Sequence, residues 1–316
     1  MSGDILAIQA INLYKSFKDK VAVSNLSLKV KQGEVYSFLG PNGAGKSTTI
    51  KMLVTLLDPT SGEIYIQGVN TQQNSMQARL TIGVAMQDSS LDESQTGEEF
   101  LILQGKLYGL TDKKIKARLI ELQGLIDIGD AMYKQIKTYS GGMKRRLDLA
   151  GSIFHKPSVL FLDEPTTGLD PISRAKVWDE VRRLNQELGT TIFLTTQYLE
   201  EADSLADRVG IINQGKLSIE GTPTDLKNSI GEDLIIVKAE NLTTKVLESV
   251  KRLEGVTKAD IYGNELTIST TTSAKTIGKV AIELSNSNIN IDNLTMRNTT
   301  LDDVFLEVTG NRLSSK

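Results

Sequence analysis

Residues 40–48 read Gly40-Pro41-Asn42-Gly43-Ala44-Gly45-Lys46-Ser47-Thr48. The apolar segment 35–39 before them predicts a buried strand, and the segment 49–57 after them predicts a helix. A glycine-rich turn between a strand and a helix is the phosphate-loop pattern, and a chance glycine-rich turn would not be expected to have both flanks. We therefore expect an α/β fold with a parallel sheet at its core.

The phosphate loop has the chemistry of a nucleotide site. Its glycines let the backbone curl with the N–H groups pointing inward, and the helix start adds about half a positive charge that faces an anion. Lys46 is predicted to reach the β- and γ-phosphates, and Ser47 to offer its hydroxyl to Mg²⁺, which prefers oxygen ligands. All nine residues are predicted to contact a nucleoside triphosphate.

The second feature is an acidic strand end. Residues 159–162 predict a buried strand that delivers Asp163 and Glu164 to its carboxyl end, where ligands bind in open α/β sheets. Adjacent carboxylates raise each other's pKa unless a cation lies nearby, so we predict that Asp163 faces Mg²⁺ and that Glu164 faces the attacking water. The alternative is a pair that points into solvent, but the tight turn 165–170 that follows favours catalysis.

A second anion-binding helix start lies shortly before that strand. Residues 139–146 read Tyr139-Ser140-Gly141-Gly142-Met143-Lys144-Arg145-Arg146, in which Ser140 is a good helix N-cap beside two glycines. This run resembles the signature motif of the ABC family, and the resemblance covers roughly residues 8–222. It implies an ATPase that dimerises head to tail, with Ser140, Gly141 and Gly142 of one subunit closing over the γ-phosphate held by the other.

The same resemblance implies roles for three more residues, in the expected order along the chain. Phe17 occupies the position of the aromatic that stacks on adenine. Gln87 occupies that of the loop glutamine that joins the catalytic Mg²⁺ to a membrane partner, and Asp170 lies in the inter-subunit loop. Taken alone, Phe17 could be a core residue and Gln87 a polar surface residue.

The chain departs from the family pattern at two places. In the switch segment 195–203, Gln197 stands where most members have histidine. Its amide can donate to the γ-phosphate but cannot gain a proton near neutral pH, and the sole histidine, His155, is predicted to lie at a helix end without a catalytic role. Met143 replaces the usual signature glutamine and Tyr139 the usual leucine, which puts in doubt a contact from Met143 to the ribose.

The signature run, the Gln197 segment and the tail 300–306 together resemble the daunorubicin-resistance type of exporter ATPase. This resemblance implies export of a drug-like or lipophilic compound through a separate transmembrane permease subunit. Two alternatives stay open. A soluble, non-transport ABC ATPase usually carries two cassettes or long coiled coils, and a kinase or metabolic enzyme with a phosphate loop would leave the Ser140 motif unexplained.

Two domains are predicted. Residues 1–228 form the nucleotide-binding domain, with a RecA-like parallel core, an antiparallel β subdomain and a helical subdomain at about 89–155. Residues 229–316 read strand, helix, strand, strand, helix, strand, which is the order of a ferredoxin-like α+β unit. The second domain could be regulatory, could contact the second copy of a dimer or could contact a partner; alternatively, it only stabilises the subunit.

Bulk composition restricts the partners. A formal net charge of −3 argues against nucleic acid, because phosphate binding needs a basic surface. The absence of cysteine favours a reducing compartment, and the longest apolar runs are far shorter than the roughly 20 residues that span a bilayer. We therefore expect a cytoplasmic protein, and the resemblance to ABC exporter ATPases implies that it is peripheral on the cytoplasmic face of the cell membrane.

Overall fold

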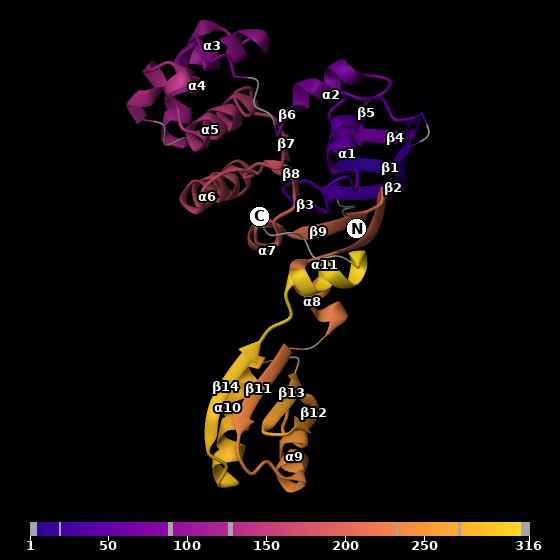
Figure 1. Ribbon diagram of the computed structural model, residues 1–316. Helices are drawn as coiled ribbons and strands as arrows, with labels where there is room; N and C mark the ends of the chain where they lie inside the picture. The colour runs from indigo at the N-terminus through magenta and orange to yellow at the C-terminus, as the bar shows by residue number, and fades with distance from the viewer. Residues whose placement is uncertain are drawn as a thin grey trace. The chain divides into compact units, whose positions relative to one another are not determined.

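The computed structural model describes residues 5–18, 20–87, 91–125, 129–231, 233–270 and 273–310. The chain forms two compact units, Met1–Pro223 and Thr224–Lys316 (Figure 1). Their boundary lies shortly before the predicted one at residues 228 and 229. The predicted start of the helical subdomain, near residue 89, lies outside the described residues.

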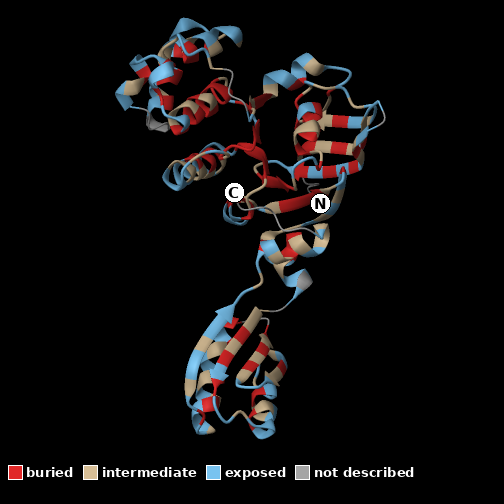
Figure 2. Ribbon diagram, in the orientation of Figure 1, coloured by how far each residue is buried: buried red, intermediate tan, exposed pale blue. Residues whose placement is uncertain are grey.

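A six-stranded sheet, in the order β10-β9-β3-β8-β7-β6, is the centre of the first unit. Five of its strands are parallel, and only the last in sequence is antiparallel to its neighbour. The strands are β3 (Val35–Leu39), β6 (Ile82–Ala85), β7 (Val159–Asp163), β8 (Thr191–Thr196), β9 (Arg208–Asn213) and β10 (Lys216–Gly221). Every residue of β3, β7 and β8 is buried, as expected for strands covered on both faces (Figure 2). The predicted parallel core is confirmed.

An antiparallel sheet, in the order β2-β1-β4-β5, forms the second layer of this unit. Its strands are β1 (Leu6–Phe17), β2 (Lys20–Lys31), β4 (Ser61–Ile66) and β5 (Val69–Asn70). Buried and exposed residues alternate along much of β2, so one face of the sheet packs inward. That face shares a hydrophobic core with α1 (Lys46–Leu53) and α2 (Ser75–Thr81), which joins the phosphate loop to both sheets.

Helices make up the third part of the first unit. They are α3 (Gly97–Leu107), α4 (Asp112–Leu125) and α5 (Gly141–Ser152), with two short 3₁₀ turns at Gly129–Tyr133 and Ile136–Thr138. A capping box starts α3, because the Thr96 hydroxyl accepts from the Glu99 backbone while the Glu99 carboxylate accepts from the Thr96 backbone. Two further helices, α6 (Pro171–Leu188) and α7 (Leu199–Leu205), follow β7 and β8.

The second unit has the predicted α+β arrangement. Its elements are α8 (Pro223–Ile230), β11 (Asp233–Ala239), α9 (Thr244–Lys251), β12 (Val256–Tyr262), β13 (Glu265–Thr270), α10 (Ser273–Asn286), β14 (Ile291–Arg297) and α11 (Leu301–Thr309). The antiparallel sheet order β12-β13-β11-β14 with two helices is the ferredoxin-like arrangement. Its own core includes Ile235, Val237, Leu266 and Val280.

Helix length and polarity bear on membrane insertion. Within the described ranges, no helix combines the length and the apolar character that crossing a bilayer requires.

Candidate functional site

The carboxyl ends of β3, β6, β7 and β8 meet at a cavity of about 510 Å³. Ligands bind at this edge in open α/β sheets. Most of the residues predicted from the sequence line it, together with three that were not predicted, Lys20, Ala22 and Thr167. The lining consists of Phe17, Lys20, Ala22, Pro41, Asn42, Gly43, Gly45, Lys46, Ser47, Thr48, Gln87, Glu164, Thr167 and Gln197.

Lys46 is the first residue of α1 and is only 4% exposed. Its Nζ donates to the Gly40 carbonyl at 2.8 Å and to the Pro41 carbonyl at 3.3 Å, and lies 3.4 Å from Glu164 Oε1. Burial lowers the pKa of the Lys46 ammonium, whereas the Glu164 carboxylate opposes that shift. The loop therefore holds a buried cation whose side chain lines the cavity.

Close packing explains why the loop contains glycine at positions 40 and 45. Gly45 has φ of +109°, and a Cβ there would lie 2.5 Å from the Ala22 carbonyl oxygen. A Cβ at Gly40 would lie 2.5 Å from the Ile212 carbonyl oxygen. Gly40 and the buried Ala44 do not line the cavity, so their part in the site is to shape the loop.

Hydroxyl groups surround the Asp163 carboxylate at the end of β7. Asp163 Oδ1 accepts from Thr195 Oγ1 at 2.6 Å and from Ser47 Oγ at 3.4 Å. Hydroxyl and carboxylate oxygens suit Mg²⁺, which takes its remaining ligands from phosphates and water. Among the described residues, no group of three histidine, cysteine or acidic side chains could hold a metal ion.

Glu164 is held in a conformation that points its carboxylate at Lys46. Its φ of +47° is in the left-handed region, which non-glycine residues rarely adopt. The Glu164 N–H donates to both the carbonyl and the hydroxyl oxygen of Thr195, with N···O distances of 3.1 Å. Thr167 Oγ1 donates to Glu164 Oε2 at 3.2 Å. Since Glu164 is 8% exposed and Asp163 2%, the acidic pair does not point into solvent.

Phe17, Gln87 and Gln197 approach the same cavity from three different segments. Phe17 ends β1 and is 48% exposed, which excludes a core role. The Lys15 ammonium lies 5.3 Å from the centre of its ring. Gln87 follows β6 and Gln197 follows β8, so both amides are available to a ligand in the cavity.

The signature residues lie elsewhere on the first unit. Ser140 is the N-cap of α5 and accepts from the Met143 N–H at 3.3 Å. Ser140 and Gly141 are exposed, whereas Gly142 is buried beside Ser173. None of the three signature residues Ser140, Gly141 and Gly142 lines the cavity of its own chain.

Asp170 is likewise outside the cavity and is the N-cap of α6. Its Oδ1 accepts from the N–H groups of Ile172 and Ser173 at 3.0 Å each. The Ser173 hydroxyl donates to Asp170 Oδ2 at 2.6 Å. This bond is the largest cause, and the backbone bonds a further one, of the lowered pKa of the Asp170 carboxyl. Asp170 therefore remains ionised on an exposed surface.

The departures from the family pattern have structural explanations. Tyr139 is buried and its hydroxyl donates to the Ala131 carbonyl, so the tyrosine fills the helical core where leucine is usual. Met143 packs against the same core. His155 stacks on Tyr108 with ring centres 3.6 Å apart, and its Nε2 is 3.0 Å from the Ile82 carbonyl oxygen, which agrees with a non-catalytic role.

Glu201 on α7 is a site-supporting residue that the sequence did not reveal. It is fully buried, and its Oε1 accepts from Thr166 Oγ1 at 2.9 Å and from Trp178 Nε1 at 3.0 Å. Glu201 therefore connects the helix after Gln197 to the turn after Glu164. Burial raises the pKa of its carboxyl, although the hydrogen bonds from Thr196, Thr166 and Trp178 oppose the shift.

We expect Glu201→Gln to gain stability relative to the wild type as the pH rises. A raised folded-state pKa favours the protonated acid, so this contribution to the free energy of unfolding is complete below the unfolded pKa and is lost as the pH rises through the folded pKa. Urea unfolding can be followed by the fluorescence of Trp178, the only tryptophan. Glu200→Gln, on the exposed side of α7, is the control that should match the wild type at every pH. The interpretation would be contradicted if the free energy of unfolding of Glu201→Gln, relative to that of the wild type, fell as the pH rises.

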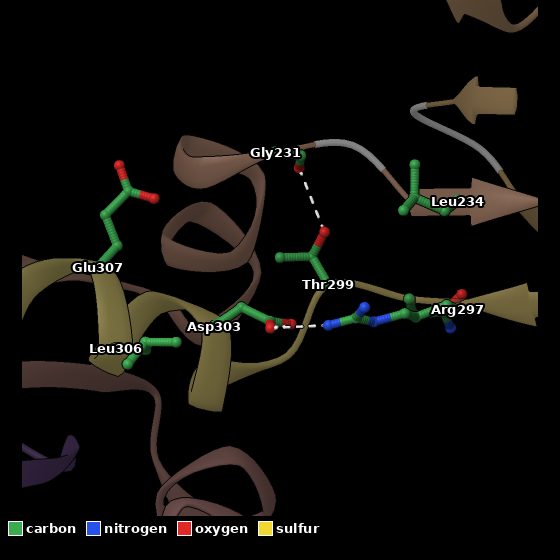
Figure 3. Close-up of a pocket in the computed structure, with 8 residues that line it drawn as sticks. Gly231, Leu234, Arg297, Thr299, Asp303, Leu306 and Glu307 are labelled. Atoms are coloured by element: carbon green, nitrogen blue, oxygen red, sulfur yellow. Dashed lines mark hydrogen bonds and ion pairs between the residues drawn. The ribbon is translucent and has the colours of Figure 1, made fainter. Parts of the chain in front are cut away.

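The second unit has a smaller cavity, of about 410 Å³, between the end of β14 and α11 (Figure 3). Thr299 Oγ1 donates to the Gly231 carbonyl at 3.4 Å, and Arg297 pairs with Asp303 at 3.2 Å across its wall. Because the arginine already has a carboxylate partner, we assign no ligand to this cavity.

The fold and the cavity are those of a phosphate-loop ATPase, and a second helix start preceded by a serine cap, at Ser140, is exposed outside the cavity. The chain belongs to the family of ATP-binding subunits of ABC transporters. The ABC transporter family model matches residues 23–167, and a model described as the C-terminal domain of DrrA1-3-like ATP-binding proteins matches residues 221–309. The predicted family and ATPase activity are thereby confirmed.

Curated relatives resemble the chain over nearly its whole length. The daunorubicin resistance ATP-binding protein DrrA3 of Streptomyces coeruleorubidus is 43% identical over 96% of each chain. The daunorubicin/doxorubicin resistance ATP-binding protein DrrA of Streptomyces peucetius is 42% identical over 96% of this chain and 92% of its own. The linearmycin resistance ATP-binding protein LnrL of Bacillus subtilis is 36% identical over 97% of this chain and 99% of its own.

Solved structures resemble about two thirds of the chain. The structure of an ATP-binding subunit of an ABC transporter matches with a TM-score of 0.64 and 26% identity. The match covers 71% of this chain and 92% of the other. A dimeric ATP-binding cassette in a post-hydrolysis state, bound to ADP and Pi, has a TM-score of 0.62 and 25% identity, with coverage of 68% and 98%.

Proposed function

We propose that two copies of this chain bind two MgATP between them and power the export of a drug-like or lipophilic compound through a separate membrane subunit. One observation carries the proposal. Most of the residues predicted to hold the triphosphate and to hydrolyse it line one cavity, whereas Ser140 and Gly141 are exposed outside it. A second chain, placed head to tail, would add the Ser140 helix start to the one that begins at Lys46, and Asp170 would then lie in the interface.

The proposed reaction is the attack of water on the γ-phosphate of ATP. Glu164 takes the proton of the attacking water, the new P–O bond forms, and the bond to the β-phosphate oxygen breaks to release ADP and phosphate. Lys46 holds the β- and γ-phosphates, and the Phe17 ring stacks on adenine. Gln87 and Gln197 orient the water and the γ-phosphate by amide hydrogen bonds, without a protonated histidine.

Mg²⁺ would be held by Ser47 and Asp163, with Gln87 near its shell, because their oxygen atoms match its preference. When bound, it would neutralise charge on the transferred phosphoryl group. Thr195 fixes the Asp163 carboxylate through the 2.6 Å hydrogen bond.

The membrane subunit is proposed to dock in a groove of about 510 Å³ next to Gln87. The groove lies between β6, α3 and α5, and Met86, the residue before Gln87, lines it. Leu56 on its rim is 64% exposed, so the groove offers apolar surface to a short apolar segment of a partner. We further propose that the complex lies at the cytoplasmic face of the membrane.

Inside-out vesicles from cells that produce the chain together with a candidate membrane subunit test the proposal. Daunorubicin, named in the relatives, is the fluorescent probe. We expect uptake that needs both ATP and Mg²⁺, that stops when a chelator removes the metal, and that is lost with Glu164→Gln. ATP hydrolysis without any membrane binding or uptake would favour the soluble ABC ATPase, and a phosphorylated acceptor in place of free phosphate would favour the kinase.

A further inference from the structure

Arg145, five residues after Ser140, is a buried cation that the proposed reaction does not use. It is 8% exposed, and its guanidinium donates to four oxygen atoms. The acceptors are the carbonyls of Met86 at 2.5 Å, Pro165 at 2.9 Å and Asp163 at 3.2 Å, and Asp148 Oδ2 at 3.2 Å. Three different segments of the first unit thus meet at one side chain.

These acceptors are next to two predicted active-site residues. Asp163 and Pro165 flank Glu164, and Met86 precedes Gln87. Glu164 has a φ of +47°, which a non-glycine residue keeps only when its surroundings impose it. Hydrogen bonds from Arg145 to the carbonyls on both sides of Glu164 provide such a constraint.

We propose that Arg145 is a positioning residue for ATP hydrolysis. It fixes the backbone next to Glu164 and next to Gln87 relative to α5, the helix that begins after Ser140. This inference rests on the proposed function, because it assumes that Glu164 polarises the attacking water. The guanidinium touches neither the cavity nor, by this account, the nucleotide. Movement of Ser140 at the start of α5 would then be transmitted to Glu164 through Arg145.

The geometry requires arginine rather than a general cation. Nε and both terminal nitrogens donate in different directions, and a planar fork with five N–H groups can do this, whereas a lysine ammonium cannot reach all four acceptors. Asp148, one turn further along α5, orients one end of the fork. Asp148 and Met86 also line the groove next to Gln87, so the network extends to the proposed docking surface.

The test is a double-mutant cycle of Arg145→Lys and Glu164→Gln, measured as single-turnover ATP hydrolysis and as binding of a fluorescent ATP analogue. Arg145→Lys alone should lower the rate about 10- to 100-fold, because a small misplacement of a catalytic group has effects of this size. ATP binding should stay within about twofold of the wild type. In the Glu164→Gln background, Arg145→Lys should lower the hydrolysis rate less than about threefold. The effects of two residues that act as one unit are not additive.

Two further variants make the outcome decisive. Arg183→Lys, an exposed arginine paired with Glu187, is the matched control and should retain wild-type rates. Asp148→Asn, which keeps a side-chain oxygen, should lower the rate in the same direction as Arg145→Lys but less, and it replaces that variant if the latter does not fold. Pro165 is left unchanged, because only its backbone carbonyl accepts from Arg145.

The results separate the two claims. Equal rates for Glu164→Gln and the wild type would overturn the proposed function itself. If Glu164→Gln is slow, the inference about Arg145 is overturned by a wild-type rate in Arg145→Lys, by equal losses in both backgrounds, or by a parallel loss of ATP binding.

Discussion

Glu164→Gln is expected to slow ATP turnover by about 10²- to 10⁴-fold, the usual contribution of a positioned general base. The amide keeps the shape of the side chain but cannot take a proton from water. ATP affinity should be largely retained, because Lys46 and the loop N–H groups still face the phosphates. Phosphate release and binding of a fluorescent ATP analogue measure the two quantities separately.

Glu200→Gln is the matched control for this experiment. Glu200 is exposed on α7 and lies outside the cavity, so its variant should hydrolyse ATP at the wild-type rate. Turnover of Glu164→Gln within a few-fold of the wild type would refute the assignment of Glu164 as the base.

Lys46→Ala is expected to weaken triphosphate binding itself. A hydrogen bond to a charged group contributes roughly 1.5–3 kcal/mol, so affinity should fall about 10- to 100-fold. The same change removes the ammonium 3.4 Å from Glu164 Oε1 and leaves a buried carboxylate without its cation. Titration with a fluorescent ATP analogue in the presence of Mg²⁺ measures the loss.

Lys51→Ala controls for the loss of a lysine from α1. Lys51 is exposed on the same helix and does not line the cavity. The Lys51→Ala variant should therefore bind the ATP analogue with wild-type affinity. An unchanged titration for Lys46→Ala would contradict the placement of the phosphate loop.

Local patterns in the sequence were sufficient for much of the site. The phosphate loop depends on spacing within nine residues, and the acidic strand end on a buried run followed by two carboxylates. Both therefore appear in the structure at the edge where parallel strands end. The ferredoxin-like order of the second unit was also predictable, because it follows from the sequence of strands and helices alone.

Residues whose role depends on distant partners were not predictable. Arg145 reads in the sequence as one of three basic residues after the signature glycines, and only the fold brings Met86 and Pro165 to its guanidinium. Thr167 and Glu201 were noticed only as members of longer segments. The bond from Thr167 to Glu164 lies within one turn, but its presence depends on the conformation of that turn. The bond between Glu201 and Thr166 joins segments 35 residues apart that no local spacing rule connects.

The central claim is that Ser140 of one subunit completes the nucleotide site begun by Lys46 of another. Light scattering on Glu164→Gln, with and without saturating MgATP, tests it most directly. The account predicts that nucleotide shifts the mass from the 34.6 kDa of one chain to twice that value. Single protomers under saturating MgATP would contradict it.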